Sequence, residues 1–424
     1  MNTSNNKWTS HDIRWVLSLF GTAIGAGVLL LPISAGLGGL IPLLVILVLA
    51  FPMTYLAHRN LCRFVLSSSN PKDDITFVAE SYFGKGGGFL ITVLYFFAIL
   101  PILLVYSANL TTTLIEFLIN QFHFDAATLH GARIWISFLI VGALVLVSIF
   151  GEGVVTRAMS FLVFPFIIFL FILSLLLIPQ WNTALFTNID FSVLQTSNFW
   201  VTLWLVIPVM VFSFNHSPII SSLACFCKKE YGDDAEFRAR RIISSAVVLM
   251  VFVVMFFIFS CALTFTPEEF ASAKDQNVNI LTFIANKFPQ VAILTYVGPI
   301  VALVAISKSF LGHYLGSQEG LNGILYKASN GKIQGKLAQT LTAIITFIVA
   351  WYVAYKNPSV IGIIETIGGP VLAILLFLMP IYCIYRFDIL AKFRNKILDI
   401  FIAIMGIVAI SAVVHNLILE YFVK

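Results

Sequence analysis

Charge is scarce in this chain. Only 11% of its 424 residues are Asp, Glu, Lys or Arg, whereas a soluble protein carries roughly 25%. Hydrophobic residues make up 59%, and the mean hydropathy is +0.97. A water-soluble fold of this length cannot hide so much apolar surface, which excludes soluble enzymes and soluble binding domains. The composition predicts an all-α, polytopic membrane protein.

Cysteine is also scarce. The five cysteines are too few and too scattered for a disulfide framework. The one close pair, Cys225 and Cys227, has no second pair and no His cluster to complete a metal site. We therefore expect neither a bound metal nor any other cofactor.

Familiar catalytic motifs are missing as well. The chain contains no HExxH and no GxSxG, and the GKGGG run at 84–88 lacks the spacing and the Ser or Thr of a P-loop. There is also no soluble domain that would hydrolyse ATP. These absences argue against an enzyme and against an ATP-driven pump. The net charge of +5 lies in short loops, where it indicates orientation rather than nucleic-acid binding.

Long apolar runs are what the sequence does contain. A helix of roughly 17–25 apolar residues crosses a bilayer, and no small-residue cleavage site follows the first run, so we expect that run to stay in the membrane. The predicted spans are 13–36, 39–61, 89–119, 133–150, 156–178, 199–226, 242–265, 290–317, 338–355, 360–385 and 397–421.

Lys and Arg are distributed unequally between the loops. With the N-terminus inside, nineteen of the 25 lie in inside loops, five lie outside, and Lys308 lies within a span. An excess of Lys and Arg marks the cytoplasmic side. We therefore expect a cytoplasmic N-terminus and a C-terminus on the periplasmic or extracellular side.

Two spans contain residues that break helices. GTAIGAGVLLLP at 21–32 places three glycines and a proline in the first span, and SFNHSP at 213–218 interrupts the sixth. Proline removes a backbone donor, and Asn and Ser side chains compete for backbone bonds. Hydrocarbon offers no water to the freed backbone N–H and C=O groups, so at each break these groups need other hydrogen-bond partners.

The two breaks occupy matching positions, each at the start of five spans. Because five is odd, the second unit starts on the opposite side of the membrane, which is the pattern of an inverted-repeat transporter. Small-xxx-small packing of Gly21 and Gly25 and a simple proline kink are the alternative explanations. The predicted parts are a cytoplasmic tail (1–12), a first unit (13–178), a second unit (199–385) and an eleventh helix (397–421).

Several long segments resemble a known family. They are GTAIGAGVLLLPISAGLGG, YFFAILPILLVYS, IPVMVFSFNHSPIISS, AISKSFLGHYLGSQEG and IETIGGP. They resemble bacterial serine transporters of the hydroxy/aromatic amino acid permease family, in the amino acid–polyamine–organocation superfamily, over nearly the whole chain. The resemblance implies a LeuT-like 5+5 inverted repeat with broken helices 1 and 6 plus an eleventh helix, in the bacterial inner membrane. It also implies proton-coupled uptake of L-serine, with L-threonine left open.

Both breaks contribute to the expected substrate site, since freed N–H groups bind a carboxylate and freed carbonyls bind an ammonium. Tyr106 is included because related folds place an aromatic residue of span three near the substrate carboxylate. Packing between helices is its alternative role, and His216 is either a proton relay or a hydrogen-bonded spacer. The candidate binding residues are Thr22, Ala23, Gly25, Ala26, Gly27, Tyr106, Ser213, Phe214, Asn215 and His216.

Lys308 lies deep inside span eight, and an ionisable residue at such depth is a functional candidate by default. Desolvation disfavours its charged form, so we expect it to exchange a proton during transport, in the place of a sodium ion in LeuT-like symporters. A structural ion pair is the alternative. The residues assigned to this role with Lys308 are Gly21, Ser307, Ser309 and His313. Glu365 is the candidate outer gate, whereas His58 and Arg59 are interpreted as markers of the inner interface.

Two further functions remain open from the sequence. A sodium-coupled symporter of another small neutral amino acid would use the same breaks, and an ion channel also tolerates broken helices and buried charge. Counterflow of labelled serine separates a carrier from a channel. The expected partners are L-serine, protons and the lipid bilayer, without nucleic acid, and the oligomeric state is left open.

Overall fold

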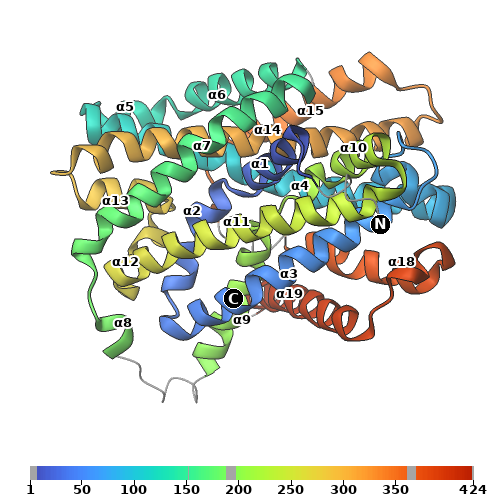
Figure 1. The fold of residues 1–424 in the computed structure, drawn as a ribbon. Coiled ribbons are helices and arrows are strands. Elements are labelled where there is room, and N and C mark those ends of the chain that lie inside the picture. Colours follow the sequence, from blue (N-terminus) through green and yellow to red (C-terminus); the bar gives the residue numbers. More distant parts are fainter. Residues whose placement is uncertain (1–6, 151, 188–196, 361–368, 423–424) are drawn as a thin grey trace.

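The computed structural model describes residues 7–150, 152–187, 197–360 and 369–422, and within these ranges it is helical and contains no strand (Figure 1). The helices are α1 (Ser10–Ala23), α2 (Ala26–Gly36), α3 (Leu40–Leu66), α4 (Ile75–Phe122), α5 (Ala126–Gly131), α6 (Arg133–Ile149), α7 (Glu152–Leu177), α8 (Ala184–Thr187), α9 (Ser197–Ser213), α10 (Ile220–Tyr231), α11 (Ala235–Thr264), α12 (Pro267–Asp275), α13 (Ile280–Lys287), α14 (Gly298–Ala328), α15 (Gly335–Lys356), α17 (Gly369–Ala373), α18 (Met379–Arg386) and α19 (Lys396–Phe422).

Ten of the eleven predicted spans fall on one of these helices or on consecutive ones. The remaining one, 360–385, includes residues 361–368, which lie outside the described residues, and its described part contains α17 and α18. In the described ranges, six helices are long and apolar enough to cross a membrane, and the bent pair α1–α2 makes a seventh. One of the six, the run from Phe199 to Thr264, covers two predicted spans. The fold is thus that of a polytopic helical membrane protein, as predicted.

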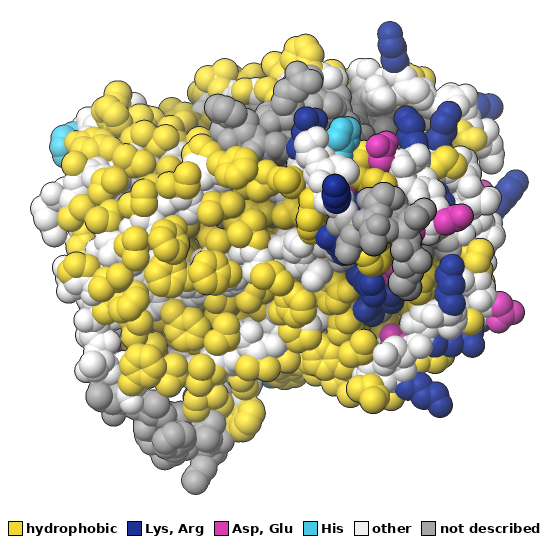
Figure 2. All heavy atoms as spheres, viewed as in Figure 1, with side chains coloured by type: hydrophobic (Ala, Val, Ile, Leu, Met, Phe, Trp, Pro, Cys, Tyr) yellow, Lys and Arg dark blue, Asp and Glu magenta, His cyan; other side chains and the backbone are white. Residues whose placement is uncertain are grey.

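The surface is largely apolar. On the face drawn in Figure 2, hydrophobic side chains cover the greater part, and Lys and Arg gather at one end, near α10 and α18 of Figure 1. Large apolar side chains such as Val48, Phe252 and Ile397 are 70%, 65% and 81% exposed. An apolar surface of this extent marks contact with a membrane or a partner, and here the long apolar helices indicate lipid.

The long helix α4 is bent near its start. Gly84 has φ 69° and ψ −179°, a left-handed backbone that glycine adopts without a steric penalty. Asp74 begins the helix as its N-cap, because its side chain accepts the N–H groups of Thr76 and Phe77. We call the segment 75–83, between the cap and this bend, the α4 arm.

Helix α14 packs against α4, α7 and α1. Small residues allow this packing: a Cβ on Gly316 would lie 2.8 Å from side-chain atoms of Ile99 and Pro218, and one on Gly320 would lie 3.1 Å from Phe96. Such close approach of backbones is how helices associate in lipid. As a result, α14 brings its own polar residues against the first broken helix.

Candidate functional site

The first predicted break lies between α1 and α2. Helix α1 ends at Ala23, Ile24 is extended at φ −83° and ψ 96°, and α2 begins at Ala26. The two helices are bent by 54° across this break. The carbonyl groups at the end of α1 therefore lose their helical partners, as the glycine-rich sequence predicts.

A hydroxyl group from α14 meets these carbonyls. Ser309 Oγ lies 2.9 Å from Ile24 O and 3.3 Å from Gly21 O, and it donates to them. A Cβ on Gly25 would overlap the Ser309 side chain and lie 3.3 Å from Tyr106 Cε1. Only glycine fits at position 25 while α14 stays in this position.

The second predicted break lies between α9 and α10. Helix α9 ends at Ser213, a 3₁₀ turn covers Ser217–Ile219, and α10 begins at Ile220. Within the break, Asn215 Oδ1 accepts the Ser217 N–H at 3.1 Å. The Ser213 hydroxyl lies 2.8 Å from Gly27 O of α2 and donates to it. This contact joins the residues that flank the two breaks.

His216 is turned toward α3. Its ring stacks on that of His58, with centroids 3.6 Å apart and planes 11° from parallel. The His216 backbone N–H donates to His58 Nε2 at 3.1 Å. His58 is 1% exposed and contacts His216, so it is more than the marker of the inner interface that the sequence indicated. It belongs to the break, and only its tertiary packing reveals this.

Tyr106 and His313 lie beside the first break. His313 Nδ1 is 2.9 Å from Ser309 O, and its ring meets the Tyr106 ring edge-on at 5.0 Å. The Tyr106 ring is also 6.1 Å from that of Phe212, on α9. Both Tyr106 and His313 are buried, and His313 Nε2 has no hydrogen-bond partner among the described residues.

Lys308 of α14 is fully buried where this helix packs against α1 and α7. A Cβ on Gly21 would lie 3.7 Å from its Cδ atom, and its Nζ atom is 5.0 Å from the centroid of the Phe166 ring. Within the described part of the chain, the ammonium has no hydrogen-bond partner. The aromatic face of Phe166 is an electrostatic contact for a cation, and no sequence pattern distinguishes this residue among 40 phenylalanines.

The other predicted residues are placed less centrally. Thr22 is buried and bonds back to Ser18 O at 2.9 Å, Ala23 and Phe214 are buried apolar residues, and Ser307 is half-buried on α14. Ala26 begins α2, but its side chain, like the whole of Glu365, lies outside the described residues. The predicted gate at Glu365 thus has no structural description.

A cavity of about 600 Å³ lies at the end of the bundle whose loops are predicted to be cytoplasmic. Its wall includes Pro218 from the 3₁₀ turn within the second break, Asp74 and Thr76 at the start of α4, and Tyr326 near the end of α14. The cavity therefore reaches from these loops to the second break.

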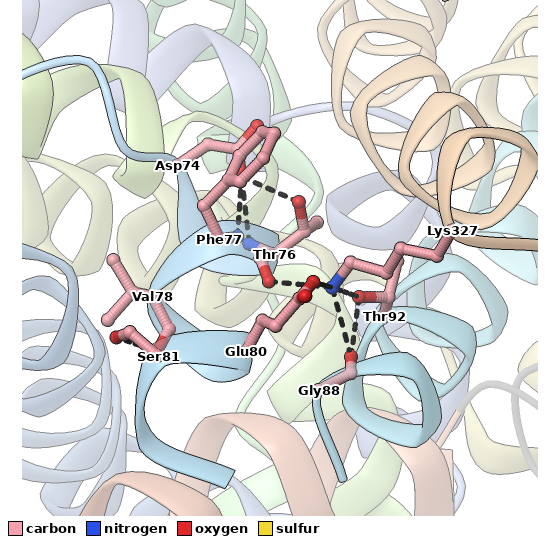
Figure 3. Close-up of polar contacts among 9 residues, drawn as sticks. All are labelled: Asp74, Thr76, Phe77, Val78, Glu80, Ser81, Gly88, Thr92 and Lys327. Carbon is pink, nitrogen blue, oxygen red and sulfur yellow. Dashed lines mark hydrogen bonds and ion pairs between the residues drawn. The ribbon is translucent and has the colours of Figure 1, made fainter. Parts of the chain in front are cut away.

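The α4 arm forms one wall of the cavity, and Lys327 of α14 holds it (Figure 3). The Lys327 Nζ atom lies 3.1 Å from a Glu80 carboxylate oxygen, and it donates to Thr76 O at 2.9 Å and Thr92 Oγ1 at 3.0 Å. Gly88 O is 3.4 Å away. One ammonium thus binds both sides of the bend at Gly84.

The carboxyl group of Asp74 caps the arm at the cavity wall. Burial raises the pKa of Asp74, and the hydrogen bonds from Thr76 and Phe77 oppose this effect. Lys327 lies close enough to oppose it as well. Burial outweighs these contacts, so the pKa of the capping carboxyl lies above its usual range.

Sequence comparison places the chain in a family. The model of the tryptophan/tyrosine permease family matches residues 13–419. The chain belongs to this family. The permease is 49% identical to the serine transporter SdaC of Escherichia coli K12, with 98% of this chain and 96% of SdaC aligned. It is 44% identical to the threonine/serine transporter TdcC of Escherichia fergusonii, with 96% of each chain aligned.

Solved structures share the fold of the permease. MhsT, crystallised with L-phenylalanine, has a TM-score of 0.61 at 15% identity, covering 96% of this chain and 98% of its own. A manganese transporter variant from Eremococcus coleocola has a TM-score of 0.66 at 13% identity, covering 96% and 86%. Both neighbours have the LeuT fold, and at these identities the likeness concerns the fold alone.

Proposed function

We propose that the permease is a carrier rather than an enzyme: a secondary active transporter that takes up L-serine, and L-threonine as a second substrate, together with protons. The observation that carries the proposal is Lys308, a buried ammonium without a hydrogen-bond partner among the described residues, lying against the first broken helix. The names of SdaC and TdcC support the substrate class.

The substrate would bind between the two breaks. Helix α2 begins inside the first break, and the first N–H groups of a helix have no intrahelical partner, so they suit a carboxylate. The carbonyl groups at the end of α1 suit the substrate ammonium. Tyr106 and Asn215 would border the substrate, because Tyr106 approaches Gly25 and the Asn215 Nδ2 atom is a buried donor without a described partner.

Lys308 would carry the coupled proton. A buried cation without a counter-charge is costly in a membrane, and the aromatic ring of Phe166 offsets only part of this cost. Loss of the proton removes this cost. The conformations of the transporter would therefore differ in how strongly they stabilise the protonated form of Lys308. Ser309 links this residue to the substrate site, because it follows Lys308 directly and bonds to the break.

The orientation of the chain in the membrane is proposed from the charge distribution. We assign the Lys- and Arg-rich end to the cytoplasm, which places the N-terminus inside and the C-terminus outside. The resemblance to bacterial serine transporters supports the bacterial inner membrane as its location. The cavity beside the α4 arm would then be the route by which the substrate leaves. The units 13–178 and 199–385 would be the two inverted repeats.

Uptake by purified protein in liposomes tests this proposal. Serine uptake should follow an imposed pH gradient without sodium, and Lys308→Met should abolish the coupled uptake while serine binding persists. The matched control is Lys332→Met, which removes an exposed lysine outside the spans. Uptake that needs sodium and ignores the pH gradient would reject proton coupling, and a wild-type protein that binds no serine would reject the substrate.

A further inference from the structure

We infer that His58 of α3 is a positioning residue of the substrate site, because it fixes the shape of the break between α9 and α10. This inference rests on the proposed function only in that the break is taken as part of the site. Its basis is a set of hydrogen bonds that determine which nitrogen of each ring carries a proton.

The tautomer of His58 follows from its two partners. Its Nδ1 atom lies 2.8 Å from Thr54 O, and a carbonyl oxygen only accepts, so Nδ1 carries the hydrogen. In the neutral ring, Nε2 then holds a lone pair. This lone pair accepts the backbone N–H of His216 at 3.1 Å. The two bonds agree with one neutral tautomer and with no other protonation state.

This bond replaces one that the break removes. In a continuous helix the His216 N–H would donate to the carbonyl four residues earlier, but the helix ends at Ser213. His216 is fully buried, so without His58 the N–H would stay unpaired, at a cost comparable to a lost hydrogen bond. The imidazole of α3 thus makes the non-helical backbone stable at this depth.

The stacked rings restrict the break further. His216 Nδ1 lies 3.0 Å from Phe214 O and donates to it, so Nδ1 of this ring carries a hydrogen. With one face on His58, the His216 ring is held by stacking and by its own backbone. Between these contacts and the 3₁₀ turn, Asn215 has little freedom, and its Nδ2 atom is kept as a buried donor without a described partner.

Two substitutions separate the hydrogen bond from the stacking. His58→Phe keeps an aromatic ring against His216 but removes the acceptor, whereas His58→Gln removes the ring but supplies an amide oxygen as acceptor. We expect His58→Phe to weaken serine binding about tenfold, the effect of about 1.4 kcal/mol, and His58→Gln to restore binding to within about threefold of wild type. If the His58 side chain contributed by packing alone, His58→Gln would weaken serine binding more than His58→Phe.

Hydrogen exchange gives a readout that does not depend on transport. The peptide spanning 213–219 should exchange its amides faster in His58→Phe than in wild type, and at the wild-type rate in His58→Gln. In the wild-type protein, ¹⁵N-histidine NMR should report His58 as the neutral Nδ1–H tautomer, assigned by the signal lost in His58→Gln.

The outcomes distinguish this inference from the proposed function. Wild-type serine binding to His58→Phe, unchanged exchange at 213–219, or an Nε2–H tautomer would each overturn the role of His58 and leave serine transport intact. Conversely, a wild-type protein that binds no serine would reject the substrate, while the exchange and NMR results would still decide whether His58 holds the break.

Discussion

Both broken helices leave backbone groups without helical hydrogen bonds, and different side chains bond to these groups at the two breaks. At the first break, glycines leave bare backbone, and a hydroxyl from α14 reaches the freed carbonyls. At the second, Asn215 pairs with the turn that follows it, and an imidazole from α3 accepts the remaining N–H. Glycine breaks a helix by permitting close approach, whereas Asn and His break it by supplying replacement bonds.

The partners also differ in their place in the fold. The first break lies in the predicted first unit and is met by α14, the third span of the second unit. The second break is met by α3, the second span of the first unit. The inverted repeat would make the two breaks equivalent, yet their partners are not equivalent. In the proposed mechanism, the first break would therefore be the one linked to Lys308, and the second would mainly shape the substrate site.

Among substitutions that test this comparison, Gly25→Ala should give the largest effect. The added methyl group would overlap the Ser309 side chain and press on Tyr106, and buried overpacking forces backbone shifts costing roughly 1–3 kcal/mol or more. We expect serine uptake to fall at least about tenfold. Gly131→Ala is the control, because no atom lies near its Cβ position. Normal uptake by Gly25→Ala would show that the first break is not closely packed.

Ser309→Ala should have the next largest effect. It leaves the Ile24 and Gly21 carbonyls without their hydroxyl partner, and a buried unpaired polar group costs about 1–3 kcal/mol. We expect roughly tenfold weaker uptake, measured in liposomes. Ser317→Ala is the matched control, since that buried hydroxyl has no hydrogen-bond partner among the described residues. Equal losses in both variants would mean that the bond to the break is unimportant.

Lys327→Met extends the comparison to the bend at Gly84, where an ammonium meets the freed backbone. The variant loses the Glu80 ion pair and the bonds to Thr76 and Thr92, so we expect a thermal midpoint several degrees lower, in line with a loss of about 1–3 kcal/mol. Thermal unfolding in detergent measures this, with the exposed Lys332→Met as control. A midpoint equal to that of the control would show that the α4 arm stays in place without Lys327.

Asp74→Asn should give the smallest effect, visible in the pH dependence of stability. Because burial raises the pKa of Asp74, its folded form binds a proton more tightly than the unfolded chain, whose Asp pKa is about 3.9. This contribution is fully present below that pH and is lost as pH rises through the folded pKa. Asn keeps the cap but does not titrate.

The difference in thermal midpoint between wild type and Asp74→Asn measures this contribution. Wild type should lose thermal stability relative to Asp74→Asn as the pH rises from about 4 through the raised pKa of Asp74. A difference that does not change with pH would contradict the desolvation of the Asp74 carboxyl.

The sequence by itself determined the membrane class, the helical ranges and the positions of both breaks. These properties depend on local composition, since apolar runs and helix-breaking residues act wherever they stand in the chain. It also singled out Lys308 and Ser309, because polar residues are conspicuous in an apolar helix.

Only the tertiary structure decided which residues contact each break and the buried lysine beside it. His58 is 158 positions from His216, and its neighbours along α3 do not distinguish it from an interfacial histidine. Likewise, Phe166 is one of 40 phenylalanines until packing places its ring beside Lys308. Hydrogen bonds and ring contacts between distant segments depend on how helices cross, and no local pattern of residues encodes that.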